Sequence, residues 1–154
     1  MESRQRIVEV GDEAATEKFG LALGRSLGPG DIVGLVGRLG AGKTALTRAI
    51  ATGAGIPPST VVNSPTFTIL NIYDGPDIDL YHLDLYRIED PEELEGLALA
   101  DLLDSGGALV VEWFDTFPEA FPADALTINI EITGEDSRRL MMRAGGPNSE
   151  ELLP

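Results

Sequence analysis

The chain has 154 residues, no cysteine and a formal net charge of −15, with 26 acidic against 11 basic side chains. This length suits one domain with a substantial core, and the hydrophobic content of 43% is that of a soluble globular protein. Without cysteine there are no disulfides, thiolate metal sites or cysteine nucleophiles, and the negative charge disfavours direct binding to nucleic acid or to an anionic membrane.

The N-terminal part of the chain carries alternating signals for strands and helices. Residues 5–10 alternate weakly between apolar and polar types and predict a strand. A helix is predicted over residues 12–26, because Asp12 is a suitable N-terminal cap and apolar residues recur on one face. After a Gly-Pro-Gly turn, residues 32–36 form a short apolar run that is typical of a strand buried on both faces.

The segment after this strand is Gly37-Arg38-Leu39-Gly40-Ala41-Gly42-Lys43-Thr44, which matches the phosphate-binding P-loop pattern G-x-x-x-x-G-K-S/T. Its glycines allow the backbone to wrap around a phosphate chain, so we expect residues 39–44 to bind the phosphates. Lys43 is expected to reach the β- and γ-phosphates, and the Thr44 hydroxyl to ligate Mg²⁺. The next helix, predicted to about Ala54, adds the partial positive charge of its N-terminus.

The middle of the chain predicts a hairpin followed by a helix. A loop with three prolines covers residues 55–65, and a strand hairpin is predicted over 66–86 with its turn at 74–76. Asp90-Pro91-Glu92-Glu93 is a strong helix start, because its first residue is a good cap, its proline suits the first helical position and its last glutamate completes a capping box. This helix is expected to continue to about Leu103, and Gly96 is a candidate position for a break in it.

The last third predicts one buried strand at residues 108–112 and a closing hairpin over 126–144. Residues 145–154 are expected to form a disordered tail, which leaves residues 1–144 as a single P-loop ATPase domain. Parallel strands joined by helices near the P-loop, with hairpins elsewhere, predict an α/β fold. We expect a P-loop NTPase-like, three-layer domain whose central sheet is mixed and largely parallel, with hairpin additions.

Two acidic residues are candidates for the hydrolytic chemistry that a P-loop alone does not supply. Glu112 follows four apolar residues at the carboxyl end of a strand, where a second Mg²⁺-binding acid is commonly found. Asp84 shares one face of its predicted strand with His82, the only histidine, for which simple packing in the strand is the favoured interpretation. Thr66, in a Ser-Pro-Thr-Phe segment, is a weaker candidate for sensing the γ-phosphate and Mg²⁺, since a Ser-Pro turn is common.

Five blocks of sequence together resemble the TsaE (YjeE) family, the small P-loop ATPases of bacterial threonylcarbamoyladenosine (t6A) modification of tRNA. The blocks are Gly40-Ala41-Gly42-Lys43-Thr44, Ser64-Pro65-Thr66-Phe67-Thr68, His82-Leu83-Asp84-Leu85-Tyr86-Arg87, Asp90-Pro91-Glu92-Glu93-Leu94 and Val111-Glu112-Trp113. They come in the family's order and approximate spacing, and the resemblance covers the chain from about residue 10 to residue 140.

The resemblance implies a Mg²⁺-dependent ATPase that acts with two partners, the threonylcarbamoyl transferase subunit TsaD and its inactive paralogue TsaB, and that meets tRNA only through them. It also implies that Thr44 and Glu112 bind Mg²⁺ and that Asp84 is needed for hydrolysis. By the same resemblance, Glu13 and Ser137 lie near the adenine base. Catalysis is therefore expected to depend on Lys43, Asp84 and Glu112.

Two positions depart from the family pattern. Arg38 stands where the family usually has Asp, and Phe114 follows Trp113 where the family usually continues with Pro. Nucleotide binding does not depend on the side chain at position 38, because the backbone forms the phosphate cradle.

Three other kinds of P-loop protein are alternatives to this interpretation. A GTPase switch is disfavoured, because neither Lys18 nor Lys43 follows an asparagine as in the guanine-reading motif Asn-Lys-x-Asp. A small-molecule kinase is disfavoured by the lack of an arginine cluster for a basic lid, while a non-hydrolytic binding module remains open. The lack of an apolar segment in residues 1–7, and of any apolar stretch near the roughly 18 residues that span a bilayer, predicts a cytoplasmic protein without membrane contact.

Overall fold

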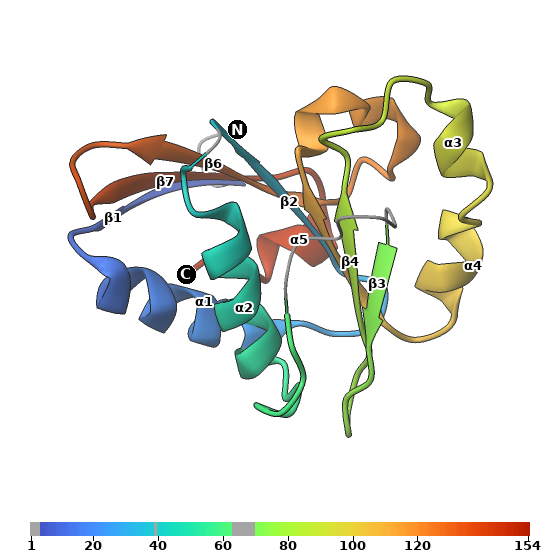
Figure 1. Ribbon diagram of the computed structural model, residues 1–154, viewed down its shortest axis with the longest axis horizontal. Helices are drawn as coiled ribbons and strands as arrows, with labels where there is room; N and C mark the ends of the chain where they lie inside the picture. The colour runs from blue at the N-terminus through green and yellow to red at the C-terminus, as the bar shows by residue number, and fades with distance from the viewer. Residues whose placement is uncertain (1–3, 39, 63–69) are drawn as a thin grey trace.

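A computed structural model describes residues 4–38, 40–62 and 70–154, and a seven-stranded sheet with the order β1-β7-β6-β2-β5-β4-β3 forms its centre (Figure 1). The strands are β1 (Gln5–Val10), β2 (Ile32–Gly37), β3 (Leu70–Tyr73), β4 (Leu80–Asp84), β5 (Ala108–Glu112), β6 (Leu126–Ile132) and β7 (Arg138–Ala144). The helices are α1 (Glu13–Ser26), α2 (Lys43–Gly53), α3 (Glu92–Glu95), α4 (Leu99–Asp104) and α5 (Pro147–Glu150), with 3-10 turns η2 (Phe114–Thr116) and η3 (Pro118–Ala120).

The four central strands, β6, β2, β5 and β4, pair in parallel, while β1, β7 and β3 add antiparallel strands at the two edges. The expected α/β fold with a mixed sheet is thereby confirmed, with parallel pairing confined to the centre. The carboxyl ends of β2, β4 and β5 meet at one edge of the sheet, where α/β proteins commonly bind ligands. The residues that follow or end these strands are the P-loop, Asp84 and Glu112.

Hydrophobic clusters cover both faces of the sheet, because successive residues of a strand point to opposite sides. In β5, Val110 belongs to a cluster with Leu46 and Ile50 of α2, whereas Val111 belongs to a second cluster with Leu94 of α3 and Phe121. Helices α1 and α2 therefore lie on one face, and α3 and α4 on the other (Figure 1). The three-layer arrangement follows from this division.

Helix α1 packs closely against α2, which brings the start of α1 beside the P-loop helix. The Asp12 side chain caps α1 by accepting a hydrogen bond of 2.8 Å from the main-chain N–H of Ala15, as expected. A Cβ at Gly20 or Gly24 would overlap Ala49 or the carbonyl oxygen of Ile50, so only glycine permits this approach.

In the described residues, no helix combines the length and apolar character needed to cross a bilayer.

The expectation of a disordered tail over residues 145–154 is wrong. Residues Pro147–Glu150 form α5, and Leu152, which is 7% exposed, packs in the cluster under α1 and α2. Both oxygens of Asp124 accept hydrogen bonds from the first turn of α5, from the main-chain N–H groups of Asn148 (3.0 Å) and Ser149 (2.9 Å). A carboxylate distant in the sequence thus caps this helix, and the apolar Leu152 stabilises it by burial.

The expected helix from residue 90 to Leu103 forms as two short helices, α3 and α4, and α3 ends at its C-cap Gly96, the candidate position for a break. Asp90 does act near the start, since its Oδ1 accepts a hydrogen bond of 2.9 Å from the N–H of Glu92. The chain turns between the helices at Ala98, whose φ of 49° lies in the left-handed region.

The first part of the expected strand over 66–73 falls on residues outside those the structure describes.

Candidate functional site

The P-loop connects β2 to α2 and has the backbone conformation that its glycines permit. Gly40 and Gly42 have φ values of 84° and 101°, a region that other residues rarely adopt. Gly42 is also the N-terminal cap residue of α2, and no side-chain hydrogen bond from this residue caps the helix. The first N–H groups of α2 are therefore presented at the carboxyl edge of the sheet, where they suit an anion. Leu39 lies outside the described residues.

Lys43 is 5% exposed, and its ammonium is held by the loop itself. Its Nζ donates hydrogen bonds to the carbonyl oxygens of Gly37 (2.6 Å) and Arg38 (2.9 Å) and lies 4.1 Å from the centre of the Trp113 ring. Burial lowers the pKa of Lys43, and the nearby negative charges of Glu112, Asp84 and Asp115 oppose this shift. A cation is thus placed among acidic groups at the mouth of the P-loop.

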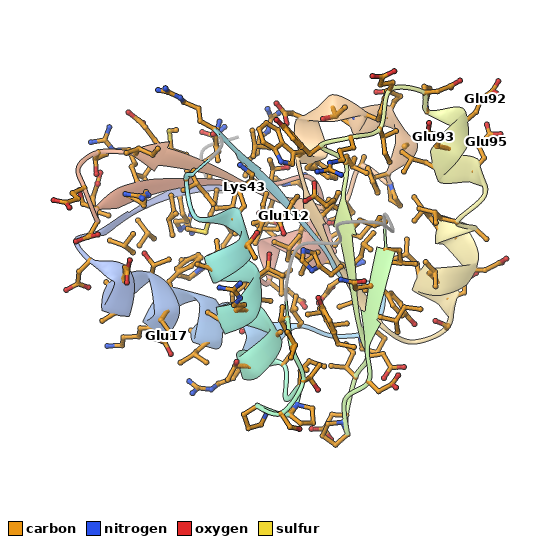
Figure 2. The ribbon with its side chains drawn as sticks, in the orientation of Figure 1. Glu17, Lys43, Glu92, Glu93, Glu95 and Glu112 are labelled. Carbon is orange, nitrogen blue, oxygen red and sulfur yellow. The ribbon has the colours of Figure 1, made fainter. Side chains whose placement is uncertain are left out.

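Thr44 and Glu112, the two predicted Mg²⁺ ligands, are in direct contact. The Thr44 hydroxyl donates a hydrogen bond of 3.1 Å to Oε1 of Glu112, which is 2% exposed at the end of β5. Figure 2 shows Lys43 at the start of α2 and Glu112 at the end of β5. These two oxygen-bearing side chains are of the types that Mg²⁺ takes in P-loop proteins.

Asp84 reaches the same edge of the sheet on the neighbouring strand. The register of β4 with β5 pairs Asp84 with Glu112, so both carboxylates point to the α2 face. Oδ1 of Asp84 accepts a hydrogen bond of 3.0 Å from the N–H of Tyr86, which fixes the chain as it leaves β4. The structure therefore brings together all three predicted catalytic residues, Lys43, Asp84 and Glu112.

Two further residues, His82 and Tyr73, contact the site although the sequence did not predict their involvement. His82 is fully buried, and its Nε2 lies 2.5 Å from Oε2 of Glu112, while its Nδ1 lies 3.1 Å from the hydroxyl of Tyr73. The strand period that put His82 on the face of Asp84 was the available signal. Tyr73 gave none, because its position opposite Leu80 depends on the register of the β3–β4 hairpin.

Trp113 follows Glu112 in a left-handed conformation, with a φ of 60°. Its ring contacts the ring of Tyr86, with 4.9 Å between ring centroids, as well as the ammonium of Lys43. Such a conformation is costly for a bulky residue and persists where the surrounding contacts hold it, often at a functional site. Trp113 thus covers Lys43 directly beside the two acids.

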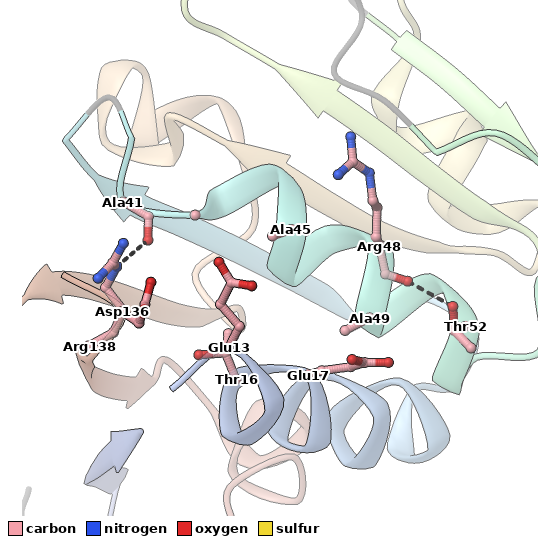
Figure 3. Close-up of a pocket in the computed structure, with 11 residues that line it drawn as sticks. Glu13, Thr16, Glu17, Ala41, Ala45, Arg48, Ala49, Thr52, Asp136 and Arg138 are labelled. Carbon is pink, nitrogen blue, oxygen red and sulfur yellow. Dashed lines mark hydrogen bonds between the residues drawn. The ribbon is translucent and has the colours of Figure 1, made fainter. Parts of the chain in front are cut away.

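A pocket of about 500 Å³ lies between α1, α2 and the β6–β7 turn, beside the P-loop (Figure 3). Glu13 lines it from α1 and Arg138 from β7, and Nε of Arg138 donates a hydrogen bond of 2.9 Å to the carbonyl oxygen of Ala41. Ser137 lies next to this lining and accepts a hydrogen bond of 2.9 Å from the hydroxyl of Thr133. The volume is in the range of about 300–1,000 Å³ that is usual for small-molecule sites. Thr66, the other predicted nucleotide-binding residue, is outside the described part of the chain.

Residues 10–140 match the family model described as threonylcarbamoyl adenosine biosynthesis protein TsaE. The chain belongs to the TsaE family. A relative from Bacillus subtilis (strain 168), named tRNA threonylcarbamoyladenosine biosynthesis protein TsaE, is 43% identical over 125 residues, which are 81% of this chain and 76% of the relative. A TsaE of the same name from Rickettsia bellii is 36% identical over 126 residues, 82% of this chain and 86% of that protein.

The fold also matches a solved structure. The crystal structure of Bacillus subtilis YdiB superposes with a TM-score of 0.80 and 32% sequence identity, and the match covers 96% of this chain and 90% of that one. The region that matches the TsaE family model includes the P-loop, Asp84 and Glu112. The candidate site therefore lies within the part of the chain that the family shares.

Proposed function

We propose that this TsaE-family protein binds ATP with Mg²⁺ at its P-loop and hydrolyses it. Through this activity it supports threonylcarbamoylation of adenosine in tRNA, together with TsaD-like and TsaB-like partners. The observation that carries the proposal is the 3.1 Å contact between the Thr44 hydroxyl and the Glu112 carboxylate, directly after a glycine-rich phosphate loop. The names of its relatives support the place in t6A biosynthesis.

The residues of the loop fit a triphosphate and its metal ion. The N–H groups at the start of α2 and the ammonium of Lys43 would bind phosphate oxygens, and Thr44 and Glu112 would hold Mg²⁺. Bound Mg²⁺ supplies positive charge that stabilises the negative charge developing on the phosphate oxygens. Asp84 lies beside Glu112 and is the candidate for orienting the attacking water and accepting its proton.

The pocket between α1, α2 and the β6–β7 turn is our candidate site for the adenosine. It is continuous with the P-loop through Ala41 and Gly42, and Glu13 and Arg138 supply polar groups at its lining. Its position agrees with the expectation that Glu13 and the segment around Ser137 lie near the base. Competition between ATP and GTP in a binding titration tests this assignment, since guanine presents different hydrogen-bonding groups from adenine.

We expect slow hydrolysis by this protein alone and faster hydrolysis with its partners. The two arginines of the pocket, Arg48 and Arg138, already donate to the carbonyl oxygens of Val62 and Ala41, at 2.7 and 2.9 Å. An arginine supplied by a partner can raise the rate of phosphoryl transfer by about 10³ to 10⁵. Equal rates with and without TsaD and TsaB would reject activation by these partners.

The decisive experiment combines binding and turnover in matched variants. Thr44→Ala and Lys43→Ala should weaken Mg²⁺–ATP binding measured by calorimetry. Glu112→Gln removes the charge of a proposed Mg²⁺ ligand and should lower phosphate release by about 10²- to 10⁴-fold. Unchanged ATP affinity in both loop variants contradicts the P-loop assignment. An unchanged rate in Glu112→Gln favours a binding module with little hydrolysis, and transfer of phosphate to a small-molecule acceptor favours a kinase.

A further inference from the structure

A partly buried series of hydrogen bonds runs across three strands to the candidate metal site. Nδ2 of Asn71 donates to the hydroxyl oxygen of Tyr73 at 3.4 Å, and that hydroxyl lies 3.1 Å from Nδ1 of His82. The other ring nitrogen of His82, Nε2, lies 2.5 Å from Oε2 of Glu112. Because His82 and Glu112 have almost no exposed surface, water cannot replace the contact between them.

The chemistry of the groups gives each contact a direction. The carboxylate of Glu112 accepts hydrogen bonds, so Nε2 of His82 carries the proton and donates it. Nδ1 is then the acceptor, and the hydroxyl of Tyr73 donates to it. The Asn71 amide in turn donates to the Tyr73 oxygen, so the tautomer with the proton on Nε2 satisfies all three contacts.

Both oxygens of Glu112 are held, and they are held by different elements. Oε2 contacts His82 on β4, while Oε1 accepts from the hydroxyl of Thr44 on α2. The last torsion of a glutamate side chain is soft, so a carboxylate fixed at one oxygen still rotates. Because His82 holds Oε2 while Thr44 holds Oε1, this rotation is prevented and Oε1 stays directed at Thr44.

We propose that His82 is a positioning residue for Glu112: its Nε2–H fixes Oε2 so that Oε1 and the Thr44 hydroxyl together face the place of Mg²⁺. Tyr73 supports this role by fixing the ring of His82 through Nδ1. The inference rests on the proposed function. Hydrogen-bonding partners of metal ligands typically contribute about 10- to 100-fold to metal affinity or activity.

The test measures how strongly Mg²⁺ improves ATP binding. Calorimetry gives the dissociation constant of ATP with excess Mg²⁺ and with EDTA, and the ratio of the two isolates the contribution of the metal. His82→Leu should reduce this ratio at least about tenfold. His82→Gln should restore part of it, because its amide nitrogen can donate to Glu112, and Tyr73→Phe should lower the ratio by less than His82→Leu. Affinity in EDTA should stay unchanged in all variants.

Tyr81→Phe is the matched control. Tyr81 is the neighbour of His82 on β4 and is also buried, and the substitution removes a hydroxyl that contacts Ser105 on the opposite face of the sheet. We expect its ratio to equal that of the unmodified protein. A fall as large in Tyr81→Phe as in Tyr73→Phe overturns the inference, because it would reflect a general loss of packing.

Two outcomes separate this inference from the proposed function. If Mg²⁺ improves ATP binding in the unmodified protein and equally in His82→Leu, positioning by His82 is refuted. If Mg²⁺ has no effect in the unmodified protein, the proposed metal site itself fails. Should His82→Leu not fold, nitrogen NMR of the unmodified protein still decides, since its only histidine gives a single pair of ring-nitrogen signals that reports which nitrogen carries the proton. We expect the Nε2–H tautomer, and the Nδ1–H tautomer overturns the inference.

Discussion

Arg138 connects the β6–β7 hairpin to the P-loop, and its removal should weaken phosphate binding. Its Nη1 donates to carbonyl oxygens in the turn before it, at Gly134 (3.1 Å), Glu135 (3.3 Å) and Ser137 (2.7 Å). One further hydrogen bond, from Nε to Ala41 at 2.9 Å, reaches the loop. A hydrogen bond from a charged group contributes about 1.5–3 kcal/mol, and partial exposure of Arg138 places this one at the low end. Since 1.4 kcal/mol corresponds to a factor of ten, Arg138→Ala should lower ATP affinity about tenfold.

The assay compares two probes by calorimetry, ATP and inorganic triphosphate, each with Mg²⁺. If Arg138 acts by holding the P-loop, both affinities fall by a similar factor, whereas a contact with the adenosine alone would affect only ATP. Arg139→Ala is the control, because Arg139 is the next residue but forms an exposed ion pair with Glu9. Unchanged triphosphate affinity in Arg138→Ala would refute the reasoning.

Two further predictions concern the C-terminal segment. Leu152→Ala should lower the free energy of unfolding, measured by urea denaturation, by about 2–3 kcal/mol. The control is Leu153→Ala, which should lower it by less because Leu153 is only half-buried. Equal small losses in the two variants would contradict the packing of Leu152. Burial raises the pKa of Asp124, but hydrogen bonds from Ser149 and Asn148 outweigh it and hold that pKa below 3.8. Ionised Asp124 therefore stabilises the fold above pH 3.8, and this contribution is lost as pH falls through the lower pKa of the folded state. At neutral pH the unmodified protein should therefore be more stable to unfolding than Asp124→Asn, and this difference should disappear in acid. A difference that persists in acid would contradict this prediction.

The parts of the fold that depend on local sequence were predictable. The strand before the P-loop, the cap at Asp12 and the hairpin over 126–144 follow from patterns within a few residues of one another. Tertiary contacts decided the rest. The tail folds because Asp124, more than twenty residues earlier, caps α5.

The candidate site shows the same division. The motif supplied Lys43 and Thr44, and strand patterns singled out Glu112 and Asp84 as separate candidates. The contact between His82 and Glu112 could not be predicted, because it depends on the register between β4 and β5 and on a buried hydroxyl from β3. A lone histidine on a strand is more often a packed residue than a participant in a site.

The pairing of β1 with β7 has a consequence for how the chain matures during translation. Val8 of the first strand lies opposite Leu140, so this edge of the sheet cannot close until the chain as far as Leu140 has left the ribosome. Contacts between residues so far apart along the chain also slow the search for the folded state. We therefore expect the pairing of β1 with β7 to be a late step in folding.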